Sequence, residues 1–113
     1  MTNTPIGTRT RLGASTLEVP VLCFGTTSLG DMPNTYGYSV DEERARETVR
    51  AFFDGPAAFL DSSRNYGAGR SEQRVGEVIA ERGGLPEGVI VSTKLDRDMD
   101  TRRFDASRAR KSL

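Results

Sequence analysis

The sequence predicts an α/β protein built on a parallel sheet. Three short apolar segments with the length of buried strands alternate with segments whose apolar residues recur at helical spacing. Such alternation implies parallel strands joined by helical crossovers. With 113 residues the chain has the length of one ordinary domain, and its 35% apolar and 28% charged residues are typical of a globular segment.

The first twenty residues precede this alternation. Residues 1–10 are polar and predict a loose segment. Residues 11–20 hold two short apolar patches around Gly13-Ala14-Ser15-Thr16, which is typical of a β-hairpin. The N-terminus lacks the basic and apolar regions of a secretory signal, and no apolar run approaches the roughly 20 residues that span a bilayer. We therefore expect a cytoplasmic protein with no membrane partner.

The first strand is predicted from Val21 to Thr26, a continuous apolar run closed by Gly25. Cys23, the only cysteine of the chain, lies in this run, so we expect its thiol to be buried. A single cysteine also excludes an intrachain disulfide. The next residues, 27–38, are rich in Gly, Pro, Asn and Tyr and predict a loop.

A helix and a second strand follow this loop. Ser39 stands three residues before Glu42, which is the spacing of a capping box at a helix start. One face of this helix is apolar, and Gly55-Pro56 ends it; the apolar residues are Ala45, Val49 and Phe52. Ala57 to Asp61 then predicts the second strand.

The third unit repeats the same order. After a loop at 62–70, a helix is predicted from about Ser71 to the Gly83-Gly84 pair, and Val89 to Thr93 predicts the third strand. The apolar face of this helix consists of Val75, Val78 and Ile79.

The C-terminal residues are rich in charge. Residues 95–104 predict a charged loop, and Asp105 can cap a third helix that continues to Leu113. Basic and acidic residues are interleaved here, a pattern that usually marks a solvated surface. Because the formal net charge of the chain is zero, there is no electrostatic reason to expect nucleic acid as a partner.

Asp61, Tyr66 and Lys94 can carry acid–base chemistry, and they follow the ends of two predicted strands. The carboxyl ends of parallel strands meet on one face, where sites form. A nearby ammonium favours the phenolate form of a tyrosine, whose pKa is otherwise about 10, and a carboxylate would hold that ammonium in place. Such a tyrosine can give a proton to a carbonyl oxygen or take one from an alcohol. Each residue alone is more often structural or solvated, but their conjunction favours catalysis.

Other kinds of site are disfavoured. The chain contains no histidine, which excludes a Ser-His-Asp triad and a histidine-ligated metal within these residues, and one cysteine cannot build a structural zinc site. Gly67-Ala68-Gly69 precedes a predicted helix, but Glu72 stands where the dinucleotide-binding fingerprint needs a third glycine. We therefore expect these glycines to serve flexibility and close packing beside Tyr66.

Around Asp61, Tyr66 and Lys94 the sequence resembles the aldo/keto reductase family. The stretch Phe59–Glu72 is similar to the Asp-to-Tyr signature of that family, and Ser92-Thr93-Lys94 is similar to its lysine strand. The upstream residues resemble its N-terminal hairpin and its first barrel strand; they are Arg11-Leu12-Gly13, Leu17–Pro20 and Phe24-Gly25-Thr26. The resemblance covers nearly the whole chain from about Arg11 onward.

This resemblance implies the N-terminal part of a (β/α)8 TIM barrel, a fold of about 250 residues or more. Residues 1–113 would form a partial barrel, with the hairpin at 11–20 and the first three βα units at 21–113, the third helix being cut short. The catalytic histidine of the family and most contacts to the cofactor phosphates lie in later units. We therefore expect a fragment with doubtful activity by itself.

The resemblance also implies an oxidoreductase that uses NADP or NAD to interconvert an aldehyde, ketone or aldose with an alcohol or lactone. Tyr66 would be the proton donor, Lys94 would favour its phenolate, and Asp61 would pair with Lys94. The nicotinamide end of the cofactor would lie near Gly25, Thr26, Thr27 and Asp61.

The substrate would be a small carbonyl compound or a sugar. The pattern from Asn65 to Glu72 is similar to that of bacterial family members acting as aldose 1-dehydrogenases. Two alternatives stay open: a cofactor-binding regulatory subunit of a channel, and an inactive truncated product. The oligomeric state also stays open.

Overall fold

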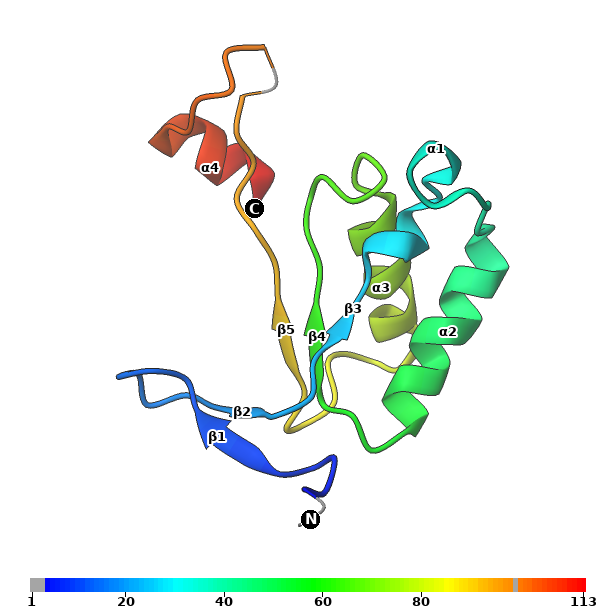
Figure 1. Cartoon of the computed structure of the whole chain (residues 1–113), viewed down its shortest axis with the longest axis vertical. Coiled ribbons are helices and arrows are strands. Elements are labelled where there is room, and N and C mark those ends of the chain that lie inside the picture. The colour runs from blue at the N-terminus through cyan, green and yellow to red at the C-terminus, as the bar shows by residue number, and fades with distance from the viewer. Residues whose placement is uncertain (1–3, 99) are drawn as a thin grey trace.

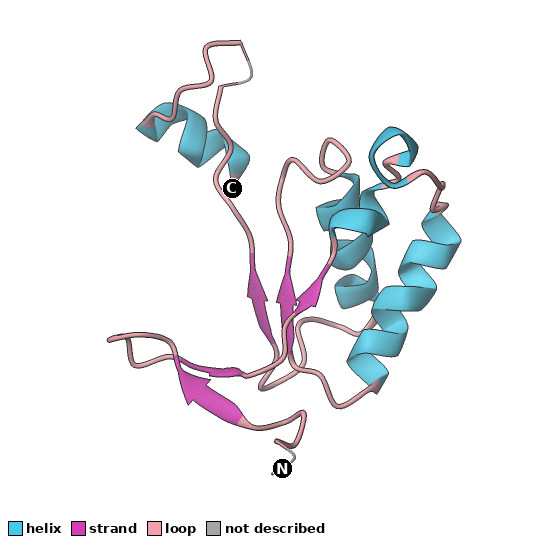
Figure 2. Cartoon of the chain, in the orientation of Figure 1, coloured by secondary structure: helices cyan, strands magenta, loops and turns pink. Residues whose placement is uncertain are grey.

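A computed structural model describes residues 4–98 and 100–113 (Figures 1 and 2). In chain order its elements are β1 (Arg9–Arg11), β2 (Glu18–Pro20), β3 (Phe24–Gly25), the 3-10 helix η1 (Thr27–Gly30), α1 (Pro33–Tyr36), α2 (Glu42–Asp54), β4 (Phe59–Asp61), α3 (Arg70–Glu81), β5 (Ile90–Ser92) and α4 (Ala106–Ser112). Strands β3, β4 and β5 form a parallel sheet in that order. Figure 1 shows α2 and α3 together on one face of this sheet. The predicted α/β class is confirmed.

The N-terminal hairpin pairs β1 with β2 in antiparallel register, Arg9 opposite Pro20 and Arg11 opposite Glu18. Its first strand begins inside the stretch 1–10 that was predicted to be loose, so that prediction is wrong for Arg9 and Thr10. Residues 1–3 of that stretch lie outside the described residues. Pairing with β2 holds these polar residues extended, because the ladder bonds involve the backbone and not the side chains.

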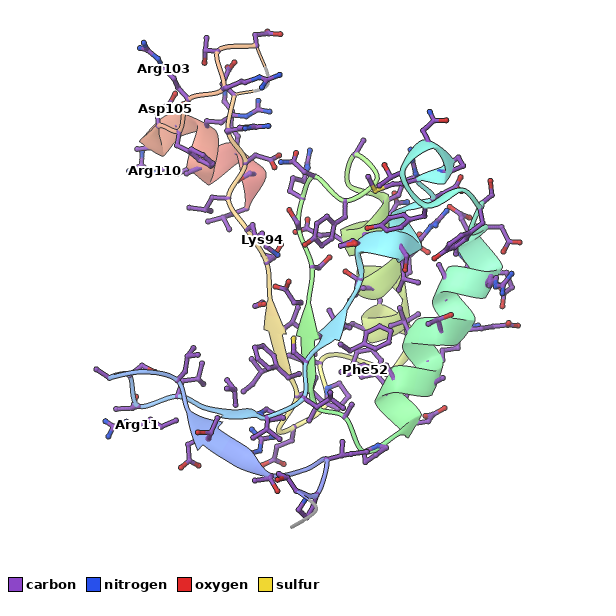
Figure 3. All side chains as sticks on the ribbon, viewed as in Figure 1. Arg11, Phe52, Lys94, Arg103, Asp105 and Arg110 are labelled. Carbon is purple, nitrogen blue, oxygen red and sulfur yellow. The ribbon has the colours of Figure 1, made fainter. Side chains whose placement is uncertain are left out.

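The hydrophobic core lies between the sheet and the two long helices. Leu60 of β4 is fully buried, and the Phe24 ring of β3 lies 5.3 Å from the Phe52 ring of α2 (Figure 3). Full burial of each such side chain contributes about 1.5–3 kcal/mol. The predicted apolar faces of α2 and α3 both pack into this core. They contribute Ala45, Val49, Phe52, Val75 and Val78.

The first strand is shorter and more open than predicted. Only Phe24 and Gly25 of the stretch 21–26 are in β3, and Val21 and Leu22 are half exposed. Cys23 is exposed, so the expectation of a buried thiol is wrong. Successive strand side chains point to opposite faces. Because Phe24 points to the helices, Cys23 points to the other face, over which Figure 1 shows no helix within the described residues.

The start of α2 also differs from the prediction. Asp41 and not Ser39 caps the helix, and its Oδ1 accepts a 2.8 Å hydrogen bond from the Arg44 amide. Val40 belongs to the preceding connection because its amide donates to Asp31 Oδ1 at 3.0 Å. The predicted cap of the last helix is confirmed: Asp105 Oδ1 accepts from the Arg108 amide at 2.8 Å.

The remaining loops contain more structure than expected. Residues 27–38, predicted as a loop, hold η1 and α1, and Pro33 occupies the first turn of α1 where proline is favoured. Helix α4 lies beyond the carboxyl end of β5, where the Asp96 amide donates to the Ser112 hydroxyl at 3.1 Å (Figure 1). Met99, within the predicted charged loop, lies outside the described residues.

The helices that the structure describes fall short of the length and apolar character of a membrane span. None of those in residues 4–98 and 100–113 is long and apolar enough to cross a bilayer. The same residues contain no cluster of three histidine, cysteine or acidic side chains that could hold a metal ion.

Candidate active site

The parallel register places the predicted site residues at one end of the sheet. Asp61 ends β4 and lies directly opposite Ser92, which ends β5. Lys94 follows two residues later, and Figure 3 shows it just beyond the carboxyl end of β5. Sites in parallel α/β structures form at this end.

The Lys94 ammonium contacts the other two predicted catalytic residues, Asp61 and Tyr66. Its Nζ lies 2.9 Å from Asp61 Oδ2 and 3.2 Å from the Tyr66 hydroxyl oxygen, and it donates to the Ser62 carbonyl at 2.8 Å. An ammonium has three donors, so these three contacts satisfy it. The Nζ atom also lies 5.0 Å from the centre of the Tyr66 ring.

Asp61 and Lys94 are held as an ion pair. Burial alone would raise the pKa of Asp61, but hydrogen bonds from Ser92 and Lys94 outweigh it and lower that pKa. Burial would lower the pKa of Lys94, but its contacts with Asp61 and Tyr66 outweigh this effect and raise it. Both groups are therefore charged at neutral pH.

Ser92 is a member of the site that the sequence prediction missed. Its hydroxyl donates to Asp61 Oδ1 at 2.5 Å, which leaves Oδ2 for Lys94. The signal in the sequence was slight. A hydroxyl residue lies two positions before Lys94 and therefore on the same face of the strand, but only the strand register shows that it meets Asp61.

Tyr66 is held by the connection between β4 and α3. Its amide donates to the Ser63 carbonyl at 3.1 Å, and its carbonyl accepts from the Ser71 amide at 3.2 Å. The next residue, Gly67, has a φ of 62°, and a side chain there would overlap the Gly30 backbone. Both the backbone conformation and the close contact require a glycine here. The predicted close packing beside Tyr66 is therefore found at Gly67.

The residues predicted to meet a cofactor lie at the end of β3, but they differ in access. Gly25 is exposed and lies opposite Asp61, and a methyl group on it would meet no atom within 4 Å. The Thr27 hydroxyl lies 2.5 Å from the hydroxyl of Tyr36, a neighbour that the prediction did not include. Gly25 is therefore open at this end of the sheet, whereas the Thr27 hydroxyl is half-buried and shared with Tyr36.

Thr26 is not available in the same way. It has no exposed surface, and its hydroxyl lies 3.0 Å from the Asp61 carbonyl and 2.9 Å from the Ser62 hydroxyl. Its side chain ties the ends of β3 and β4 together and cannot also contact a ligand in this arrangement. Among the four residues predicted to contact the cofactor, Thr26 is the one whose side chain is fully buried, and its contact with the cofactor stays a prediction.

A groove of about 340 Å³ lies next to the Tyr66 loop. One wall is formed by residues 31–35, and the other by the segment around Gly67 and the first residue of α3. Its lining includes amide, hydroxyl and guanidinium groups, namely those of Asn34, Thr35, Asn65 and Arg70. This lining is suited to a polar ligand.

Comparison with known families gives a match over most of the chain. The sequence model of the aldo/keto reductase family matches residues 21–113. An aldo-keto reductase of Bacillus subtilis is 32% identical over 89% of this chain and 30% of its own length. A pyridoxal 4-dehydrogenase of Microbacterium luteolum is 33% identical over 81% of this chain and 25% of its own.

A third relative is a probable channel subunit and not an enzyme by description. A probable voltage-gated potassium channel subunit beta of Arabidopsis thaliana is 31% identical over 74% of this chain and 24% of its own length. The chain spans between 20% and 38% of the length of eight curated relatives that it matches.

Solved structures agree with these matches. The holo form of an aldo-keto reductase from Bacillus halodurans superimposes with a TM-score of 0.60 at 29% identity, covering 81% of this chain and 27% of its own. A glycerol dehydrogenase from Gluconobacter oxydans gives a TM-score of 0.66 at 23% identity, covering 93% and 33%. These neighbours are (β/α)8 barrels, which confirms the predicted barrel class.

Proposed function

Because the chain belongs to the aldo/keto reductase family, we propose that it carries the proton-transfer part of an NAD(P)-dependent oxidoreductase site. The observation that carries this proposal is the position of the Lys94 ammonium, within 3.2 Å of the Tyr66 hydroxyl and 2.9 Å of the Asp61 carboxylate. A phenol beside a fixed cation suits reversible proton transfer to a carbonyl oxygen.

Tyr66 is the proposed general acid in the reducing direction. Its hydroxyl donates a proton to the oxygen of a bound aldehyde or ketone as the carbonyl becomes an alcohol, and it accepts that proton in the reverse direction. Lys94 stabilises the phenolate that remains, and Asp61 keeps Lys94 in place. General acid catalysis of this kind contributes about 10²–10⁴ in rate.

The residues at the end of β3 fit a flat cofactor ring. The uncovered backbone of Gly25 leaves room for one, and the Thr27 hydroxyl and the Asp61 carboxylate are polar atoms beside it. We propose that these three residues hold the nicotinamide end of NADP or NAD. When bound, that cofactor supplies or accepts the hydride.

The proposed substrate is a small carbonyl compound, and a sugar is the first class to test. Two features support a hydroxylated substrate. The pattern from Asn65 to Glu72 resembles that of aldose 1-dehydrogenases, and the groove next to the Tyr66 loop has polar side chains in a mixed lining. With an aldose the oxidised product would be a lactone. A cytoplasmic location for this reaction stays a prediction from the sequence.

The similarity to the Arabidopsis thaliana protein supports a second candidate. That protein is a probable channel subunit. With a similar role, this chain would be a cofactor-binding regulatory subunit that binds NAD(P)H without rapid turnover. Aspartate, tyrosine and lysine in this arrangement do not separate the two functions. An inactive product, which neither binds nor turns over, is the third possibility.

One experiment distinguishes the three. Residues 1–113 are placed within a complete barrel and titrated with NADPH and with NADH by fluorescence, because the fragment by itself is expected to be inactive. Turnover is then assayed on a panel of aldehydes, ketones and aldoses. Turnover that is lost in Tyr66→Phe supports the oxidoreductase. Binding without turnover supports the regulatory subunit. Absence of both, in a chain shown by circular dichroism to be folded, would overturn both proposals.

A further inference from the structure

Arg74 is a buried arginine without an acidic partner. It is only 4% exposed, and within residues 4–98 and 100–113 no carboxylate lies within ion-pair distance of it. Buried charges are rare unless they are paired, because desolvation is costly. The Arg74 Nη1 group instead donates to two backbone carbonyls, that of Leu29 at 2.5 Å and that of Val40 at 3.0 Å.

Two neighbouring side chains on α3 bind the same connection. The Arg70 guanidinium donates to the carbonyls of Gly30 at 2.8 Å and Asp31 at 2.9 Å. The Ser71 hydroxyl donates to the Thr26 carbonyl at 2.6 Å. Three side chains in the first two turns of α3 therefore hold five carbonyls of the segment 26–40, which we call the β3–α2 connection.

The position of these arginines on the helix strengthens the inference. The first turn of a helix carries partial positive charge, so a cation at Arg70 is unfavourable by a few tenths of a kcal/mol or more, and the effect falls off before Arg74. The negative ends of the carbonyl dipoles in the β3–α2 connection offset this cost for Arg70 and the desolvation cost for the buried Arg74. Contacts within α3 do not account for an arginine at either position. The hydrogen bonds that both arginines donate to carbonyls of the β3–α2 connection do account for them.

The β3–α2 connection in turn touches the loop that carries Tyr66. Gly30 and Gly67 pack backbone against backbone, and neither has room for a side chain toward the other. The Gly30 carbonyl itself accepts from Arg70, the carbonyl of the preceding Leu29 accepts from Arg74, and Gly67 directly follows Tyr66. A shift of the connection must therefore move Gly67 or leave a gap beside it.

We propose that Arg74 is a positioning residue for Tyr66, acting through the β3–α2 connection and the contact between Gly30 and Gly67. This inference rests on the proposed function, in which Tyr66 is the general acid. The distance of 3.2 Å between Tyr66 and Lys94 depends on where the Tyr66 loop lies. A misplacement of about 1 Å can cost as much as 100-fold in rate.

The first test is Arg74→Met in the full chain, which keeps the length of the side chain but removes the donors. We expect amide hydrogen exchange to rise about tenfold or more in residues 26–40, and also in 63–68, where Arg74 makes no hydrogen bond. The NMR signal of Tyr66, labelled at Cζ, should shift. Arg46→Met is the matched control, because Arg46 is a partly exposed α2 arginine whose guanidinium pairs with carboxylates and not with the β3–α2 connection.

The second test uses turnover. Arg74→Met should lower kcat by about 10–100-fold and change cofactor affinity less, since only Thr27 of the proposed cofactor contacts lies in the loosened connection. Arg74→Lys should restore part of the loss in kcat. In a Tyr66→Phe background the same change should cost almost nothing, because the group that Arg74 positions is already gone. An equal fractional loss in both backgrounds would show a general structural role and refute the inference.

Two further outcomes are distinguishable. If Arg74→Met does not fold, Arg70→Met, at the exposed start of α3, releases the Gly30 and Asp31 carbonyls and should raise exchange in the same two regions. Unchanged exchange in 63–68 in the folded variant overturns the coupling. Normal kcat in Tyr66→Phe would instead overturn the proposed function, while the exchange and NMR results would still decide whether Arg74 positions the loop.

Discussion

Ser92 and Asp61 lie opposite each other at the ends of β5 and β4, and the Ser92 hydroxyl donates a 2.5 Å hydrogen bond to Asp61 Oδ1. The other carboxylate oxygen, Oδ2, faces Lys94 at 2.9 Å. The two oxygens therefore have separate partners, and the carboxylate cannot rotate without losing one of them. The orientation of Lys94 toward Tyr66 depends on this arrangement.

Ser92→Ala should raise the pKa of Asp61 from its lowered value, because the hydrogen bond from Ser92 is one of the two contacts that lower it. A carboxyl ¹³C NMR titration of the full chain measures this directly. We expect turnover to fall by up to about tenfold, the worth of one hydrogen bond. An unchanged Asp61 titration would show that the Ser92 contact is not formed in solution.

Tyr66→Phe removes the proposed proton donor and keeps the ring. In an active preparation kcat should fall by about 10²–10⁴, the usual contribution of general acid catalysis. Cofactor affinity, measured by fluorescence titration, should change little because the ring and its surroundings remain. The parallel variant Tyr38→Phe, at an exposed tyrosine outside the site, is the control and should retain activity.

Lys94→Met removes the ammonium that contacts both Asp61 and Tyr66. We expect a loss of kcat similar in order to that of Tyr66→Phe, because the phenolate loses its stabilising cation. Combining the two changes should add little, since both act on the same proton transfer. Fully additive losses in the double variant would argue that Lys94 and Tyr66 act independently.

The Asp61–Lys94 pair should make stability depend on pH in a defined direction. The lowered pKa of Asp61 contributes stability above its ordinary pKa of 3.8, and this contribution is lost as pH falls through the folded value. The raised pKa of Lys94 contributes stability below 10.5, which is lost as pH rises through the folded value.

Urea unfolding of the full chain and of Asp61→Asn across the pH range tests this prediction. The difference between them should be largest from about pH 5 to 9 and should shrink in acid. Both side chains are partly exposed, 35% for Asp61 and 49% for Lys94, so solvent screening limits the contribution to about 1 kcal/mol or less. A difference that grows in acid would contradict the ion pair.

The sheet edges predict self-association of residues 1–113 expressed by themselves. Within the described residues, β3 and β5 each pair with one neighbour, so each leaves one edge open. Open edges favour pairing with another chain. Size-exclusion chromatography at several concentrations should show oligomers. A monomer with a single cooperative unfolding transition and tight NADPH binding would contradict this expectation.

The sequence by itself determined the features that depend on near neighbours along the chain. Apolar spacing placed the faces of α2 and α3, and the Asp105 cap of α4 needs only a backbone amide three residues away. The order of Asp61, Tyr66 and Lys94 after successive strands was enough to predict that they would meet. Parallel strands always bring their carboxyl ends to one edge.

Only the tertiary structure decided the contacts between segments distant in the chain. The hydroxyl of Ser92 meets a carboxylate 31 residues away, and Arg74 meets a carbonyl 45 residues away. Residue type does not encode such pairs, because any hydroxyl or guanidinium can bind many acceptors, and the strand register and helix docking select one. The exposure of Cys23 was decided in the same way, by which face of the sheet the helices cover.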